Sequence, residues 1–281
     1  MVLEQERRNP EHAGSSHFQR QQSRRSLGKR LMDAFYPDQE LPYRSALRNA
    51  AGRCSRVLEI GAGSGVGGGT RAPLRGSVEW VVGIDLEPAI GANPHLDAGV
   101  VADASCLPFP NESFDLVYHR MVAEHLEEPA ESMRECARVL KPGGTLVFLT
   151  PSLWYYPIII SALTTTWFHR RWISSVHRRA EHRVFPTFYR ANTRGAIARL
   201  LSDAGLEGRI SMLQTRPSYL AFFLPLLVLG IVWGQVVERL IPAFRGRILV
   251  EAKRPSRVRD ATNPDGGEIQ RQSGDPPQRI R

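Results

Sequence analysis

The sequence is poor in cysteine, and the few cysteines it has are isolated. Cys54, Cys106 and Cys136 stand far apart, and no two of them have the spacing of a metal site. A secreted scaffold held by disulfides and a zinc-binding module are therefore excluded as classes. We expect no bound metal and a reducing compartment.

The chain also begins without a long hydrophobic run. Its first residues, MVLEQERRNPEHAG, lack the apolar core of a signal peptide, so we expect no export by that route and a cytoplasmic location. Residues 1–29 and 255–281 are polar and predict disordered tails. A single domain is then expected over residues 30–254, with insertions at 151–193 and 215–246.

Basic residues outnumber acidic ones, and nearly all of them are arginine. The formal net charge is +9, and only three of the 37 basic residues are lysines. Such a surplus favours an anionic partner: phospholipid, nucleic acid or a phosphorylated substrate.

Apolar runs alternate with helical patterns through the expected domain. The strands are predicted at 56–61, 80–86, 99–103, 114–119, 145–150, 209–214 and 247–253. The helices are predicted at 41–51, 129–140 and 194–204, with LKPGG breaking the second before its strand. This order is typical of an α/β protein with helices on both faces of a largely parallel sheet.

A glycine-rich turn, VLEIGAGSG (57–65), follows the first predicted strand. Its glycines are spaced G-x-G-x-G, which differs from the G-x-G-x-x-G of dinucleotide folds. A plain tight turn is the structural alternative. Acidic residues accompany the turn: Glu59 precedes it, Asp85 ends the second strand, and Asp103 ends the third.

Five phrases together resemble the class I S-adenosylmethionine (SAM) methyltransferases, especially the group that includes ubiquinone and menaquinone biosynthesis enzymes. They are LEIGAGSG, GIDLEP, DASCLPFPNESFDLVY, AEHLEEP and ARVLKPGG, in the order and spacing of that family. The resemblance is strong over residues 56–152 and loose elsewhere. It implies a Rossmann-like seven-stranded sheet of order 3-2-1-4-5-7-6, with strand seven antiparallel, and SAM as the cofactor.

The resemblance also assigns roles to residues. Asp85 would accept hydrogen bonds from the ribose hydroxyls, Asp103 would hold the adenine amino group, and Glu59 would orient the loop or the methionine ammonium group. The other cofactor-binding positions that it implies are Gly61, Ala62, Gly63, Gly65, Leu86, Ala104, His119 and Arg120. The chain departs from the family at VGGGTRAPLRG, where Gly67–Gly69 and Pro73 predict a short or irregular first helix.

The catalytic residues are less well defined than the cofactor site. The methyl group of SAM is already activated, so transfer needs alignment and, for a hydroxyl acceptor, a base. His119 and His125 are the candidate bases, although His125 could instead pack or cap, and His119 could only line the cofactor pocket. Tyr155 and Tyr156 are candidate substrate contacts that could equally pack under the insertion.

The stretch 218–237, SYLAFFLPLLVLGIVWGQVV, has no charge and is long enough to span a bilayer. It lies between two predicted strands of one sheet, so a single crossing would separate the last strand from its partners. We expect an interfacial or re-entrant segment bent at Pro225, or a roof over the substrate pocket.

Residues 154–190 carry six arginines among tryptophan, tyrosine and phenylalanine residues. This mixture favours contact with an anionic membrane; a buried cap with a solvated basic face and nucleic-acid binding are the alternatives, the latter without a recognisable RNA-binding module. The hypothesis is a methyltransferase at the inner membrane face, acting on a lipophilic or lipid-linked small molecule. The alternatives are a soluble methyltransferase of a polar metabolite with the insertions as lid, an RNA methyltransferase, and a non-catalytic scaffold.

Overall fold

The computed structural model describes residues 27–36, 38–65, 74–155, 185–221 and 223–256. Tyr156, most of the aromatic-basic stretch, Gly67–Gly69, Pro73 and most of both predicted tails lie outside the described residues.

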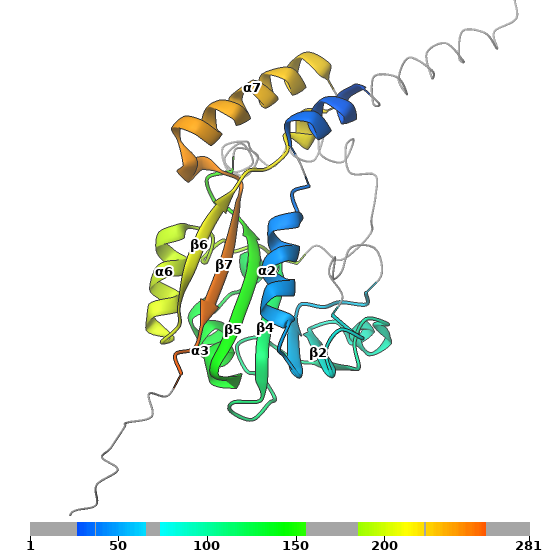
Figure 1. Ribbon diagram of the computed structural model, residues 1–281, viewed down its shortest axis with the longest axis vertical. Coiled ribbons are helices and arrows are strands. Elements are labelled where there is room, and N and C mark those ends of the chain that lie inside the picture. Colours follow the sequence, from blue (N-terminus) through cyan, green and yellow to red (C-terminus); the bar gives the residue numbers. More distant parts are fainter. Residues whose placement is uncertain (1–26, 37, 66–73, 156–184, 222, 257–281) are drawn as a thin grey trace, which may run out of the picture.

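The core is a seven-stranded sheet with the order β3-β2-β1-β4-β5-β7-β6 (Figure 1). The strands are β1 (Arg56–Ile60), β2 (Trp80–Asp85), β3 (Ala98–Val101), β4 (Phe114–Arg120), β5 (Leu140–Pro151), β6 (Glu207–Leu213) and β7 (Arg247–Lys253). β1 to β5 pair in parallel, whereas β7 pairs antiparallel with both β5 and β6. The predicted sheet order and the predicted direction of the last strand are confirmed.

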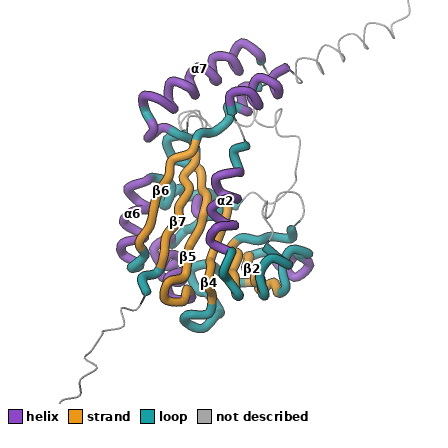
Figure 2. The backbone as a smooth tube through the Cα atoms, viewed as in Figure 1, coloured by secondary structure: helices purple, strands orange, loops and turns teal. Residues whose placement is uncertain are grey.

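Helices cover the two faces of this sheet (Figure 2). The helices on the faces are α2 (Leu41–Ala51), α3 (Pro129–Val139) and α6 (Arg194–Asp203). The helix 27–35 and α7 (Leu224–Leu240) lie beyond the strand ends, and short 3-10 turns are η1 (Pro88–Ala92), η2 (Ala123–His125), η3 (Ser218–Leu220) and η4 (Pro242–Phe244). α2 packs on β4 and β5 from one side, and its Tyr43 and Leu47 are buried there. α3 and α6 pack on the opposite face, where their apolar side chains form a second core with β1, β4, β5 and β7. Burial on both faces explains why the strands read as continuous apolar runs.

LKPGG ends the helix as predicted, but the strand that follows begins earlier than predicted. α3 ends at Val139, and β5 begins at once with Leu140 paired to Phe114 instead of at Thr145. The register then shifts before Thr145 pairs with Leu116, and Gly143 takes a left-handed φ of +81°. The glycine permits an irregular stretch inside the strand, so LKPGG belongs to β5.

The apolar stretch 218–237 also differs from its prediction. Pro225 does not bend a helix; it lies in the first turn of α7, where the missing N–H has no helical acceptor to lose. The chain turns before that proline, after η3. In the part of the chain that the structure describes, no helix combines the length and apolar character that crossing a membrane requires.

α7 and the helix 27–35 lie side by side beyond the ends of β5, β6 and β7 (Figure 1). Tyr36, Leu227 and Ile231 form the buried contact between them. Gly234 allows the close approach, because a Cβ atom there would stand 2.0 Å from the Tyr36 hydroxyl. The two helices therefore form one small layer over the edge where the parallel strands end.

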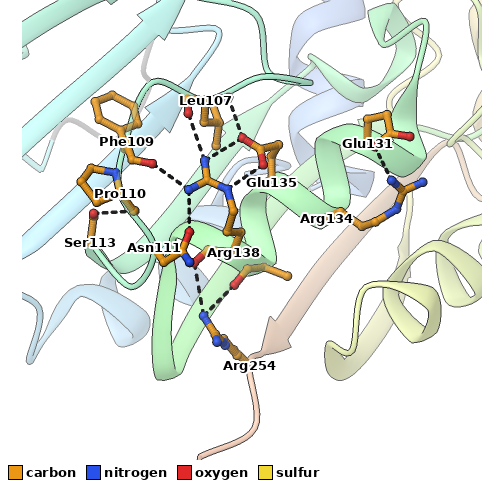
Figure 3. A network of polar contacts seen from close by, with 11 residues as sticks. Leu107, Phe109, Pro110, Asn111, Ser113, Glu131, Arg134, Glu135, Arg138 and Arg254 are labelled. Atoms are coloured by element: carbon orange, nitrogen blue, oxygen red, sulfur yellow. Dashed lines mark hydrogen bonds and ion pairs between the residues drawn. The ribbon is translucent and has the colours of Figure 1, made fainter.

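A network around Arg138 ties α3 to the loop after β3 (Figure 3). The Arg138 guanidinium donates to the carbonyls of Leu107 and Phe109, at 3.0 and 2.8 Å, and to the side chains of Asn111 and Glu135. Glu135 in turn accepts from the Leu107 amide at 2.7 Å. This loop begins at Asp103, so the network fixes the segment that follows a predicted cofactor contact.

We expect Arg138→Gln to lower the free energy of unfolding by about 2 kcal/mol, because several charge-assisted hydrogen bonds to the loop are lost together. Urea denaturation measures this change. Arg134→Gln on the same helix is the control, since the described partner of Arg134 is the solvent-exposed Glu131, and the change should alter stability by at most about 0.5 kcal/mol. Equal losses in the two variants would contradict the structural role of Arg138.

Candidate cofactor and acceptor site

The glycine-rich turn adopts a backbone that only glycine tolerates well. Gly61, Gly63 and Gly65 have φ values of +70°, +55° and +72°. A Cβ atom on Gly61 would lie 2.4 Å from the Val122 side chain, and one on Gly65 would lie 2.4 Å from Asn93 Oδ1. The turn is therefore enclosed on two sides, which explains the G-x-G-x-G spacing in steric terms.

Asn93 holds the turn, and sequence reasoning missed it. Its buried amide group donates to the carbonyls of Ala62 and Gly63, both at 3.0 Å, and its Oδ1 accepts from the His95 amide. In the sequence, Asn93 before Pro94 reads only as a turn signal. Its contact with the glycine loop depends on the tertiary fold.

Asp85 ends β2 beside the glycine turn. Its Oδ2 accepts from the Gly63 amide and its Oδ1 from the Glu87 amide, each at 2.9 Å. Among the described residues, a Cβ atom on Gly63 would meet only this carboxylate within 4 Å, and neighbouring Leu86 is 57% exposed. Within that part of the chain the turn is thus open on the side of Asp85, and an oxygen acceptor beside an open glycine backbone suits the ribose and methionine parts of SAM.

The structure brings Asp103 to the same edge. The Ala102 amide donates to the Asp85 carbonyl at 3.0 Å, which joins the ends of β2 and β3. Asp103 is exposed and accepts from the Ser105 amide and hydroxyl, both at 2.7 Å, while Ala104 next to it is buried. Asp85 and Asp103 therefore stand at adjacent strand ends, as the prediction of ribose and adenine contacts requires.

Glu59 lies within β1, one residue before the end of that strand, on the face of the sheet that α2 covers. It is 5% exposed, and its carboxylate accepts from the Tyr118 hydroxyl at 2.8 Å. Tyr118 stands on the neighbouring strand, opposite Glu59 in the register. This partner was not predicted, and the role of Glu59 toward the loop or the cofactor stays a prediction.

His119 and Arg120 follow each other on β4 and therefore point to opposite faces of the sheet. The His119 ring stacks on Phe148 at 4.5 Å between ring centres, and its Nδ1 has no hydrogen-bond partner among the described residues. Burial lowers the pKa of His119 to about 3. The imidazole is thus neutral at pH 7 and a weak base, which favours a lining role over proton abstraction.

Arg120 points to the α2 face and shares one carboxylate with Arg247 of β7. Glu40, just before α2, lies 3.0 Å from Arg120 Nε and 2.8 Å from Arg247 Nη1. Burial alone would raise the pKa of Glu40, but the hydrogen bond and charge of Arg120, with those of Arg247, lower it below the usual value. Glu40 is therefore ionised, and sequence reasoning missed it.

The AEH segment is fixed to the far end of the insertion. The backbone carbonyl of Glu124 accepts from the Phe188 and Tyr189 amides, and the His125 Nδ1 lies 2.9 Å from the Pro186 carbonyl. A carbonyl only accepts, so Nδ1 carries a proton in this contact, and in the neutral form of the ring the lone pair is then on Nε2. His125 thus has the packing contact that was one of its two predicted roles, and its action as a base stays a prediction.

Beneath this segment lies a buried polar chain that sequence reasoning also missed. The Glu124 carboxyl accepts from the Thr150 hydroxyl at 3.0 Å, and Asn192 donates to that hydroxyl at 2.7 Å. Burial raises the pKa of Glu124. The chain connects η2, the end of β5 and the start of α6.

Tyr155 lies at the same edge of the sheet. Its hydroxyl donates to the Arg216 carbonyl at 3.3 Å, and its ring contacts Gly246 closely enough that a Cβ atom there would stand 2.7 Å away. Tyr155 therefore packs against the connection between β6 and β7. Its predicted contact with substrate remains untested.

A surface groove of about 600 Å³ lies elsewhere, between α2 and the strands β6 and β7. Arg209, Met212, Arg245 and Glu251 are among its lining residues. None of the predicted cofactor residues lines it, so the groove is separate from the glycine turn.

The burial of His119 predicts a measurable pH dependence. The unfolded chain binds a proton on His119 below about pH 6.5, whereas the folded protein does so only near pH 3, so stability falls as the pH falls between these values. From pH 7 to pH 5, we expect the wild type to lose about 2 kcal/mol more unfolding free energy than His119→Gln. Urea unfolding at both pH values measures the difference, and equal losses would contradict the burial of a neutral histidine.

Comparison with known proteins identifies the domain. Residues 58–148 match the family model described as a methyltransferase domain. The chain is 36% identical over 120 residues to a Mycolicibacterium smegmatis protein described as a "probable S-adenosylmethionine-dependent methyltransferase", covering 40% of this chain and 44% of the relative. It is 34% identical over 112 residues to the ubiquinone/menaquinone biosynthesis C-methyltransferase UbiE of Laribacter hongkongensis, covering 37% and 46% respectively. The chain thus spans less than half the length of these relatives.

A solved structure shares the fold. The S-adenosylmethionine-dependent methyltransferase from Mesorhizobium loti superposes with a TM-score of 0.50 at 20% identity, over 78% of this chain and all of that one. Residues 58–148, which match the family model, contain the residues described above: Glu59, the glycine turn, Asp85, Asp103 and those of β4. Residues 58–148 are thus similar to S-adenosylmethionine-dependent methyltransferases, and the sheet has the strand order that this resemblance implied.

Proposed function

We propose that the protein transfers a methyl group from SAM to a small lipophilic or lipid-linked acceptor at a membrane surface. The methyl-transfer part rests on one observation above all: the glycine turn stands beside the Asp85 carboxylate at the strand ends, where ligands bind in open α/β sheets, within the segment that matches a methyltransferase domain. The acceptor and the membrane surface rest on the exposed face of α7.

The residues of the turn would bind and orient the cofactor. SAM supplies a methyl group already activated on a sulfonium, so the protein has mainly to align it with the acceptor. Asp85 would accept from the ribose hydroxyls, and Asp103, with Leu86 and Ala104, would bind the adenine. Asn93 keeps the turn in the open shape that this binding needs.

A hydroxyl acceptor would also need a proton acceptor. His125 suits this role better than His119, because its Nε2 keeps a lone pair and its ring is partly exposed, whereas His119 is buried and its pKa is about 3. Nδ1 bonded to the Pro186 carbonyl would fix the ring orientation during the transfer.

The lipophilic part of the proposal comes from α7. Its face opposite Tyr36 exposes a row of large apolar side chains, which includes Leu229 at 64%, Val232 at 57% and Trp233 at 52%. Exposed apolar area of this extent on one helix is typical of an interaction surface. The helix covers the edge of the sheet where an acceptor would enter.

Basic and aromatic residues surround this face. Lys29 and Arg30 are exposed on the neighbouring helix, and Arg239 is exposed near the end of α7. Trp154 and Phe244, both exposed, contact each other at 5.9 Å between ring centres beside the same edge. Apolar side chains bordered by basic and aromatic ones suit an anionic bilayer interface. The name of the UbiE relative, which refers to quinone biosynthesis, agrees with a lipophilic acceptor.

We expect Asp85→Asn to weaken SAM binding by a factor of about 10 to 100, because the amide offers one oxygen where the carboxylate offers two. Calorimetry with SAM measures the loss, and Asp203→Asn at the end of α6 is the control. Labelled methyl should pass from SAM into a lipid extract with the wild type and far less with Asp85→Asn. Equal SAM binding in both variants would contradict the cofactor site, and label found only in water-soluble products would contradict the lipophilic acceptor.

The role of α7 predicts binding to anionic vesicles. The wild type should sediment with vesicles of phosphatidylglycerol and phosphatidylcholine, and Trp233→Ser should lower the partition coefficient by about tenfold, since burial of one large apolar side chain is lost. Trp80→Ser is the matched control, because Trp80 is similarly exposed but begins β2, away from α7. Equal binding of the two variants, or no binding of the wild type, would contradict the membrane surface.

A further inference from the structure

Positive charge is concentrated beneath α7, at the edge where β4 and β5 end and β7 begins. Arg120 and Arg247 bind the same Glu40 carboxylate, and all three side chains are largely buried. Two further buried carboxyl groups stand near these three: Glu124 interacts electrostatically with Arg120, and Glu59 acts on Tyr43 together with Arg120 and Glu40. Buried charge is costly unless it is compensated, so the guanidinium donors that remain on the β7 side favour an anion.

A third arginine stands beside the cluster. Arg216, just after β6, pairs with Asp33 at 2.9 Å and donates to the Tyr36 carbonyl at 2.7 Å. Arg216 and Arg247 each follow one of two residues that are in contact, because the Thr215 side chain lies against Gly246. Three arginines thus face two carboxylates around one stretch of chain.

Several hydrogen-bond donors at this edge remain unused. The Arg216 Nε and the Thr215 hydroxyl are buried and have no partner among the described residues. Thr215 contacts Gly246, where a Cβ atom would stand 2.4 Å from its Oγ1. Arg247, which follows Gly246, engages Glu40 through one Nη, and a guanidinium has five N–H donors in total. The unused groups are therefore mostly donors, which is what an anion with several oxygens requires.

We propose that Arg247, Arg216 and Thr215 form a subsite for a phosphate group carried by the methyl acceptor. A phosphate has three free oxygens to meet these donors, where a carboxylate has two, and arginine binds phosphate in a bidentate manner. The assignment of the phosphate to the acceptor rests on the proposed function; the phosphate subsite itself does not.

The position of the subsite suits an elongated acceptor. Arg247 is on β7, three strands from β1 and its glycine turn, which corresponds to roughly 14 Å at about 4.8 Å per strand. α7 lies over the same edge and supplies apolar contacts (Figure 1). A phosphate bound at Arg247 would thus leave the rest of the molecule to extend toward the cofactor under an apolar roof.

The test uses the full chain and three variants, with calorimetric titration of dodecyl phosphate, dodecanoate, inorganic phosphate and dodecyl maltoside below their micellar concentrations. We expect dodecyl phosphate to bind the wild type, and Arg247→Gln and Arg216→Gln each to weaken it at least tenfold. Arg209→Gln is the control, since Arg209 is an exposed arginine on β6 away from this edge, and should change binding less than twofold. Thermal unfolding of each variant verifies folding, and Arg216→Gln tests the subsite without disturbing Glu40.

Comparison of the four ligands shows which chemical group the subsite recognises and whether that group belongs to an amphiphile or to a small polar molecule. Dodecyl phosphate that binds more tightly than inorganic phosphate, with the same arginine dependence, supports a phosphorylated amphiphile; equal binding of the two supports the phosphate subsite and assigns it to a small polar phosphate. Dodecanoate or dodecyl maltoside binding as tightly as dodecyl phosphate would overturn the choice of phosphate, and equal affinities in Arg247→Gln and Arg209→Gln would overturn the subsite.

Titration of SAM with the same proteins distinguishes the two proposals. If the wild type binds SAM and transfers methyl but the arginine variants bind dodecyl phosphate normally, the subsite fails alone. If the arginine-dependent binding of dodecyl phosphate is present and SAM does not bind, the proposed function fails and the subsite stands.

Discussion

The position of β7 is the constraint on which the rest of the structure depends. β7 returns antiparallel between β5 and β6, and Leu213 at the end of β6 pairs with Arg247 at its start. Residues 214–246 must therefore leave and re-enter the sheet at one edge. Because β5 also ends there, α7 is placed over the edge where the parallel strands end and where ligands bind in open α/β sheets. The same return brings Arg247 within reach of Glu40.

The strands could be predicted from the sequence because their burial on both faces leaves a local signal. The apolar runs from Arg56, Trp80 and Phe114 each became a strand within a residue or two. The order of the strands came only from the family resemblance, since pairing between residues far apart leaves no local pattern. The late predicted start of β5 and the predicted bend at Pro225 have the same cause: glycine and proline disrupt regular structure in isolation, but a strand with an irregular register and the first turn of a helix both accept them.

Residues of the candidate site could be predicted from the sequence where the backbone and its neighbours allow only one residue type. Gly61 and Gly65 are required by positive φ and by the side chains of Val122 and Asn93, so their spacing was visible in the sequence. Asn93 and Glu40 were not, because an asparagine in a turn and a glutamate before a helix have many ordinary uses. Their importance comes from the partners that the fold supplies, and no spacing in the sequence indicates those partners.

The Glu40 cluster shows how binding and stability are joined in this fold. Removing Glu40 would leave two largely buried arginines without their shared carboxylate, and the cost of an unpaired buried charge generally exceeds the gain from the pair itself. The cluster therefore fixes the start of α2 to β4 and β7 only while all three charges are present. Its Arg247 end lies between an apolar helix and the strand ends. A molecule with an anionic group and an apolar body would fit both the arginines and the apolar helix, whereas a polar metabolite would fit only the arginines.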